Sequence, residues 1–343
     1  MKSLKIHGPL DLRIDDYPLD NLGPNQVEIK IAIGGICGTD LHYYKHGGFG
    51  QIKLREPMIL GHEVSGFIVK IGSKVKNLSI GQLVSVSPSR PCNKCNFCLN
   101  GNQIQCINMK FYGSAMPFPH IQGAFREILI VEDYQCVSAD GLSSEEAAMA
   151  EPLAVCLHAI KQAEKIFGQK VLITGSGPIG TLCVAAARRA GAEEIIVTDI
   201  SANALTFSNS VGADKVINVL EEHYKLKNYQ SNKGYFDIAF ECSGSAQGIS
   251  DAINCLKPKG TMIQLGLGGD VLIPLVSVTT KELNLRGSFR FHSEFELAVD
   301  MMKKKMINVN PLITHKLNFK FAKEAFQLAM NNDKKSMKVQ LYF

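Results

Sequence analysis

The chain has 343 residues, of which 45% are hydrophobic and 20% charged, and its formal net charge is +5. This composition excludes a disordered chain and is sufficient for two domains with separate hydrophobic cores. The positive charge is small and dispersed, so no nucleic-acid partner is indicated, although an anionic substrate would suit it. The N-terminus MKSLKIHGPL lacks a signal-peptide core, and no apolar run approaches the ~18 residues that span a bilayer. We therefore expect a cytoplasmic protein without a membrane partner.

The first 150 residues have the short apolar runs that are typical of β-strands. Residues 27–33 alternate hydrophobic with polar side chains, and further runs bounded by Gly, Pro or Asn lie at 64–71, 82–86 and 125–131. We expect a mainly β domain here.

The pattern changes near residue 150 to buried apolar runs that alternate with helix-like segments. This alternation predicts a doubly wound parallel sheet of six strands. The predicted strands are 170–174, 194–199, 215–219, 236–242, 260–265 and 284–289, and the predicted helices are 178–190, 202–210 and 246–256. Beyond them, 294–305 and 322–330 are expected as helices, and 338–343 as a final strand.

A glycine-rich turn follows the first of these strands. Gly175, Gly177, Pro178, Ile179 and Gly180 form the GxGxxG pattern, which allows a tight turn and holds a diphosphate at a helix N-terminus. Asp199 ends the next strand, where it would accept hydrogen bonds from the adenosine ribose. The segment after it contains no Arg to receive a 2′-phosphate, so NAD is favoured over NADP.

Four cysteines lie close together in the first half of the chain. Cys92, Cys95, Cys98 and Cys106 have the spacing that closes a tetrahedron of thiolates around one Zn²⁺. Four unrelated buried thiols are the alternative, but successive CxxC steps rarely arise from core packing. A closed site of this kind stabilises a loop and leaves no position for substrate.

A second, open metal site is suggested by Cys37, His62 and Glu63. A thiolate, an imidazole and a carboxylate supply three ligands and leave a fourth position for water or a substrate oxygen. From spacing alone, His62 could equally be a hydrogen-bonded core histidine and Cys37 a small buried hydrophobe.

The chain resembles the zinc-dependent medium-chain dehydrogenases along essentially its whole length. GGICGTD, GHE, the four-cysteine loop, EPLA and GSGPIG occur in the order of that family. The chain is most similar to the sorbitol dehydrogenase branch, and DLHYYKHG, FYGSAMPFPH and LRGSFRF are similar to its L-idonate-oxidising members. The resemblance implies an α/β fold with a GroES-like catalytic domain at 1–150, a Rossmann NAD-binding domain at 151–289 and a C-terminal segment at 290–343 that returns to the first domain. It also implies a homodimer or homotetramer with substrate in the cleft between the domains.

Further site residues follow from this resemblance. Two zinc ions per chain are implied, with Glu151 binding the catalytic zinc directly or through water, and Asp40 orienting the His62 ring. Thr39 and His42 occupy the positions of a proton relay, and Tyr43, Arg290 and Phe291 occupy substrate-contacting positions, the last of which is usually Tyr. The cofactor is expected to contact five more positions: Leu265, Gly266, Leu267, Phe289 and Arg290.

These observations predict a zinc enzyme that transfers a hydride from a secondary alcohol to NAD. Zinc would act as a Lewis acid that eases loss of the hydroxyl proton. The leading reaction is oxidation of L-idonate to 5-dehydro-D-gluconate; the alternatives are a neutral polyol such as sorbitol or xylitol and a phosphorylated hexitol. From other classes, a non-catalytic zinc-braced nucleotide-binding protein and a nucleic-acid-binding protein are disfavoured by the open zinc site and by the missing basic, aromatic face.

Overall fold

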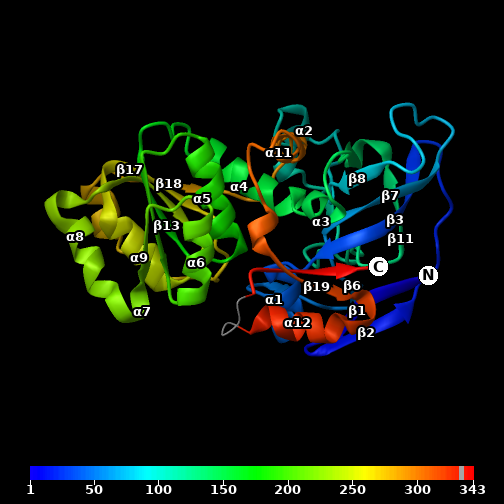
Figure 1. Ribbon diagram of the computed structural model, residues 1–343, viewed down its shortest axis with the longest axis horizontal. Helices are drawn as coiled ribbons and strands as arrows, with labels where there is room; N and C mark the ends of the chain where they lie inside the picture. Colours follow the sequence, from blue (N-terminus) through cyan, green and yellow to red (C-terminus); the bar gives the residue numbers. More distant parts are fainter. Residues whose placement is uncertain (332–335) are drawn as a thin grey trace.

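A computed structural model describes residues 1–331 and 336–343 of the chain. Its two lobes lie side by side along the long axis, with the middle of the chain in one lobe and both ends of the chain in the other (Figure 1). Among the described residues, no helix is long and apolar enough to cross a membrane.

The lobe that contains both ends is built mainly of strands, as predicted. Its largest sheet has the order β12-β8-β7-β3-β20-β19, and β11 also pairs with β3. The members are β3 (Gln26–Gly35), β7 (Glu63–Ile71), β8 (Leu83–Val86), β11 (Ile128–Glu132), β12 (Cys136–Ser138), β19 (Ile313–Asn318) and β20 (Lys338–Tyr342). Around it lie β1 (Lys2–Gly8), β2 (Asp11–Asp16), β4 (Gly48–Phe49), β5 (Ile52–Lys53), β6 (Met58–Ile59), β9 (Ser89–Arg90), β10 (Lys110–Phe111) and the helices α1 (Gly38–His46), α2 (Asn96–Leu99), α3 (Ser144–Ala147) and α12 (Ala322–Met330).

The other lobe contains the predicted doubly wound sheet. All five strand pairings are parallel, in the order β15-β14-β13-β16-β17-β18, so the order reverses between β13 and β16. The strands are β13 (Lys170–Thr174), β14 (Glu194–Asp199), β15 (Lys215–Asn218), β16 (Phe236–Glu241), β17 (Leu256–Gln264) and β18 (Asn284–Gly287). The helices are α4 (Ala150–Gln162), α5 (Pro178–Arg189), α6 (Ala202–Ser210), α7 (Val219–Glu222), α8 (Lys227–Gln230), α9 (Ala246–Cys255), α10 (Leu275–Thr280) and α11 (Glu294–Lys303). In such sheets a ligand binds beyond the carboxyl ends of the strands at the reversal.

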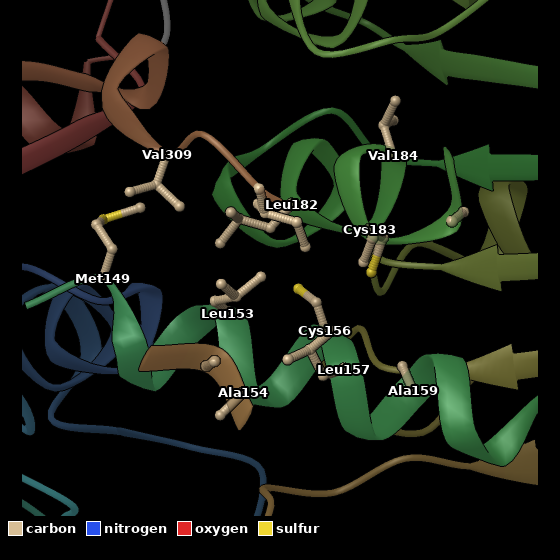
Figure 2. Close-up of a cluster of buried hydrophobic side chains, with 14 of the residues drawn as sticks. Met149, Leu153, Ala154, Cys156, Leu157, Ala159, Leu182, Cys183, Val184 and Val309 are labelled. Atoms are coloured by element: carbon tan, nitrogen blue, oxygen red, sulfur yellow. The ribbon is translucent and has the colours of Figure 1, made fainter. Parts of the chain in front are cut away.

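Helix α4 is an element that the sequence pattern did not reveal. Pro152 lies in its first turn, where a missing N–H removes no helical hydrogen bond, so the proline does not prevent the helix. Leu153 and Cys156 of α4 point toward Leu182 of α5 in the buried cluster of Figure 2, to which Leu157 also belongs. Through this packing, α4 carries Glu151 from the core of one lobe to the junction with the other.

The C-terminal segment returns to the first lobe, as the resemblance implied. β20 runs antiparallel to β3, with Gln340 opposite Gly35, and the Ile36 N–H donates to the Val339 carbonyl at 3.0 Å. The strand therefore lies beside the backbone that leads directly into Cys37. The exact boundaries at residues 150 and 289 stay predictions.

Candidate active site

Cys37, His62 and Glu63 come together in the first lobe, where β3 ends and the neighbouring strand β7 begins. Cys37 is the N-cap of α1, just after β3, while His62 precedes β7 and Glu63 begins it. One ligand atom from each lies within 4.8 Å of the others. The pattern therefore predicted the proximity of these three side chains correctly.

The electrostatics of this group suit a divalent cation. Burial, together with the Glu63 carboxylate, raises the pKa of the Cys37 thiol to about 12, and a metal ion is the kind of partner that favours the thiolate. His62 is buried, and its Nδ1 has no hydrogen-bond partner among the described residues. The donor set of sulfur, imidazole and carboxylate therefore fits zinc, which would act there as a Lewis acid.

Asp40 supports these residues differently from the prediction. Its Oδ1 lies 3.9 Å from His62 Nδ1, which is longer than a hydrogen bond. Instead, Oδ2 accepts from the Cys37 N–H at 3.0 Å and Oδ1 accepts from the Gly61 N–H at 3.1 Å. Asp40 thus fixes the backbone beside two of the candidate ligands.

Lys338 is a component of this site that sequence reasoning missed. Its Nζ lies 2.8 and 2.7 Å from the two carboxylate oxygens of Glu63, and both side chains are fully buried. It also donates to the Ile36 carbonyl at 3.4 Å. Glu63 therefore already has a cationic partner, and Lys338 and a metal ion would share its oxygens. A lysine that opens an apolar strand was the available signal.

Glu151 approaches the same group from α4. It is buried, and its pKa is raised to about 8 by burial, with Glu63 and Cys37 adding to the rise and His62 opposing it. Glu151 does not belong to the described set whose ligand atoms fall within 4.8 Å. Its predicted contact with zinc, direct or through water, stays a prediction.

The four-cysteine loop forms a second group of donor atoms. Cys92, Cys95, Cys98 and Cys106 each offer a sulfur within 4.8 Å of the others, and Cys95 Sγ lies 3.5 Å from Cys98 Sγ. Backbone N–H groups point at the sulfurs: the Lys94 N–H lowers the pKa of Cys92 to about 6, and the Cys92 N–H donates to Cys106 Sγ at 3.2 Å. Four converging thiols with such support fit a closed zinc site.

The glycine-rich turn has the geometry of a phosphate-binding loop. Gly175 has a positive φ of 92°, and a Cβ there would lie 2.8 Å from the Ser243 nitrogen. A Cβ on Gly180 would lie 1.8 Å from the Gly175 carbonyl oxygen, while Gly177 and Pro178 begin α5. The Asp199 carboxylate accepts from the Ser176 and Ser201 N–H groups at 2.6 and 2.7 Å, which fixes it at the end of β14. Ile179 is partly buried below the turn.

A cavity of about 860 Å³ separates the lobes. His42 of α1 lines one side, while the other side includes Gly244, Gly266 and Leu267 after β16 and β17. Thr39, three residues before His42 on α1, is partly exposed. Both candidate relay residues thus lie on the helix that Cys37 caps, and Leu265 packs against the core beside the loop.

The predicted substrate residues differ in their surroundings. Tyr43 is buried, and its hydroxyl accepts from the Ala115 N–H at 3.0 Å. The Arg290 guanidinium lies 4.2 Å from the Phe111 ring and 4.7 Å from the Phe289 ring, and burial lowers its pKa to about 10, against the effect of Glu151. Phe291 is 1% exposed and stacks on Phe295 in the core, so its predicted contact with substrate stays a prediction without support from its packing.

A GroES-like β domain with two zinc-type donor sets, joined to a dinucleotide-binding sheet, defines the class of this protein. Residues 23–141 match the alcohol dehydrogenase GroES-like domain, and residues 178–304 match the zinc-binding dehydrogenase family. The chain belongs to the zinc-binding dehydrogenases, and the predicted family and fold are confirmed.

Individual proteins and solved structures within this family are similar to the chain over nearly its whole length. L-idonate 5-dehydrogenase (NAD(P)(+)) of Escherichia coli (strain K12) is 40% identical over 344 residues, which cover 100% of this chain and 98% of the relative. The crystal structure of L-idonate 5-dehydrogenase from Escherichia coli K-12 is similar with a TM-score of 0.95 and 38% identity, covering 100% of this chain and 98% of that one. Sorbitol dehydrogenase of Bos taurus is 36% identical over 331 residues, 95% of this chain and 92% of the relative. Galactitol-1-phosphate dehydrogenase of Escherichia coli has a TM-score of 0.89 at 28% identity and full coverage of both chains.

Proposed function

We propose that this protein oxidises a secondary hydroxyl of a sugar acid and passes the hydride to NAD, with L-idonate and 5-dehydro-D-gluconate as substrate and product. The observation that carries the proposal is the open set of Cys37, His62 and Glu63, formed in the lobe that faces the dinucleotide-binding sheet across the cavity. The full-length similarity to L-idonate 5-dehydrogenase supports the substrate.

The chain's own residues provide for substrate and cofactor. Thr39 and His42 would conduct the hydroxyl proton to solvent along α1, and Asp199 favours NAD because it would repel a 2′-phosphate. The ten cysteines are free thiols, which suits thiolate ligands and a reducing compartment, so we place the protein in the cytoplasm.

Arg290 supports an acidic rather than a neutral polyol. Its guanidinium lies over the Phe111 and Phe289 rings, its Nη2 is 3.3 Å from Met116 Sδ, and no carboxylate in the described chain lies within 4.0 Å of it. A guanidinium that has no carboxylate within ion-pair distance can bind a substrate carboxylate through two hydrogen bonds. A neutral polyol is the second candidate, favoured by the similarity to sorbitol dehydrogenase.

The test is a comparison of kcat/KM for L-idonate, D-gluconate, sorbitol and xylitol, each with NAD and NADP. We expect L-idonate with NAD to be preferred. Arg290→Met should lower kcat/KM for L-idonate roughly 100-fold and that for sorbitol less than about tenfold, because only the acid loses a charge-assisted pair. Arg290→Lys, which keeps the charge, is the matched control. A preference for sorbitol, or equal losses on both substrates, would favour the neutral-polyol function.

We also propose that two copies of the chain associate through the outer edge of the doubly wound sheet. In the described chain, β18 pairs with β17 on one side and has no strand partner on the other. Next to it, Leu272, Leu275 and Val276 are 94%, 64% and 76% exposed. An open strand edge beside an apolar patch is completed by the same edge of a second copy across a two-fold axis.

A further inference from the structure

Glu241 is a buried glutamate that belongs neither to the two groups of metal-type donors nor to the predicted substrate, relay or cofactor residues. It is the last residue of β16, is 0% exposed, and lies at the carboxyl end of the sheet beside the point where the strand order reverses. No cationic side chain in the described residues comes within 4.0 Å of it. Buried carboxylates are normally paired with a cation, since desolvation of an unpaired charge is costly.

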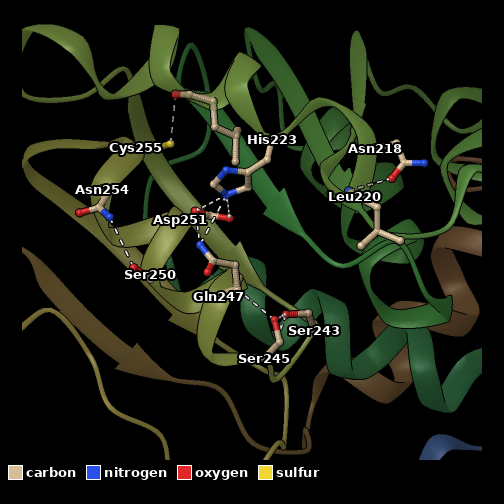
Figure 3. Close-up of polar contacts among 12 residues, drawn as sticks. Asn218, Leu220, His223, Ser243, Ser245, Gln247, Ser250, Asp251, Asn254 and Cys255 are labelled. Atoms are coloured by element: carbon tan, nitrogen blue, oxygen red, sulfur yellow. Dashed lines mark hydrogen bonds and ion pairs between the residues drawn. The ribbon is translucent and has the colours of Figure 1, made fainter.

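Neutral donors from three separate segments take the place of a cation. Thr174 Oγ1, at the end of β13, donates to Oε1 at 3.3 Å. The Ser243 and Gly244 N–H groups, in the turn before α9, donate to Oε1 at 2.9 and 3.0 Å, and Gly244 also reaches Oε2 at 3.0 Å. Gln264 Nε2, at the end of β17, donates to Oε2 at 2.6 Å. One carboxylate therefore ties together the ends of three strands; Figure 3 shows the Ser243 to Ser245 turn of this group.

The turn after β16 and the loop after β17 approach each other too closely for a side chain to fit between them. A Cβ on Gly266 would lie 2.1 Å from the Gly244 nitrogen. The Glu241 carbonyl accepts from the Leu265 and Gly266 N–H groups at 2.8 and 2.9 Å. Gly244, Gln264 and Gly266 all line the cavity between the lobes. Glu241 thus links the strand that precedes the phosphate-binding turn to the loop after β17, which lines the cavity that His42 also lines.

We propose that Glu241 is a positioning residue for the dinucleotide: it holds the turn after β13 and the loop after β17 in the relative placement that the two halves of NAD require. The inference rests on the proposed NAD-linked function. Because Glu241 connects two binding segments, its loss should weaken a ligand that spans both segments more than one that occupies a single segment.

The experiment measures the dissociation constants of NAD⁺ and of AMP by calorimetry for the native protein and for Glu241→Gln. The glutamine has the same size, but its NH₂ group would face one of the N–H donors. We expect NAD⁺ affinity to fall tenfold or more and AMP affinity to change less than threefold. Equal losses for both ligands would show a merely structural role, and unchanged NAD⁺ affinity would show none; either result overturns the inference.

If Glu241→Gln does not fold, two variants of the residues that donate hydrogen bonds to Glu241 test the same inference. Gln264→Met removes only the β17 donor and Thr174→Val only the β13 donor, so each should lower NAD⁺ affinity more than AMP affinity. Unchanged NAD⁺ affinity in both overturns the inference. A native protein that binds neither NAD⁺ nor NADP⁺ overturns the proposed function as well, whereas normal native binding with an unaffected Glu241→Gln overturns this inference alone.

Discussion

His42 lines the cavity, and its surroundings favour the neutral form of its imidazole. Burial lowers the pKa of its imidazole, and the positive charges of His46 and Lys45 lower it further. In alcohol oxidation a relay has to accept a proton, so a lowered pKa keeps the imidazole competent at pH 7.

His42→Ala should therefore lower kcat/KM roughly 100-fold or less near pH 7, and the defect should shrink as pH rises because the proton then leaves without help. His46→Ala is the matched variant on the same helix. It keeps the relay but removes a positive neighbour, so the acidic limb of the pH profile should move to higher pH. The measurements are kcat/KM from pH 6 to 10 and the melting temperature of each variant. A pH-independent defect in a less stable His42→Ala protein would contradict the relay.

For single residues, the sequence was sufficient where the residue type itself indicates a function. It was not sufficient where a residue acquires its role only through contacts in the folded chain. Cys37 and His62 are recognisable because few other side chains bind zinc. Lys338 is separated from Glu63 by 275 positions, and no periodicity links them. Phe291 is a different case: the family resemblance assigned it to a substrate-contacting position, its ring stacks on Phe295 in the core, and its contact with substrate stays a prediction.

At the scale of elements, the two sets of metal-type donors are built differently. The loop with Cys92 to Cys106 contains only short helical turns, α2 and a 3₁₀ turn at Gln103–Gln105, so converging thiolates supply much of its order. Cys37 and His62 instead adjoin α1 and β7, whose positions the seven-stranded sheet fixes.

Cys95→Ser and Cys37→Ser should consequently have different effects. The first should lower the melting temperature by about 10 °C and remove one zinc per chain, because a three-thiolate loop holds metal poorly. The second should remove the other zinc and turnover but leave a folded, NAD-binding protein. Elemental analysis, calorimetry and cofactor titration separate these outcomes. At most one zinc in fully active native protein would refute the two-site assignment.

The elements themselves were predictable to different degrees. The six parallel strands were found because buried strands are continuous apolar runs, although β17 begins at Leu256, four residues before the run that suggested it. Helix α4 was missed since Pro152 and a mixture of small and polar residues hide its period. That helix carries Glu151, so the sequence named the residue without showing how it reaches the site.

At the scale of the whole molecule, the proposed pairing through β18 makes the quaternary structure sensitive to one patch. Leu272→Glu together with Val276→Glu should convert a dimer to a monomer in light scattering, because charges would replace apolar contact across the two-fold axis. Leu99→Glu is the control, since Leu99 is 73% exposed on the distant cysteine loop. A dimer that survives the double change would place the interface elsewhere.

The position of Lys338 also bears on the order in which the active site can be assembled. Glu63 and its candidate co-ligands leave the ribosome early, but the lysine that balances Glu63 follows 275 residues later, after the whole nucleotide-binding lobe. Until β20 has been synthesised, both Lys338 and the strand that pairs beside Gly35 are missing, so the final surroundings of Glu63 cannot form. The open donor set therefore depends on the last strand of the chain, and we expect it to reach its final form only after the whole chain has been synthesised.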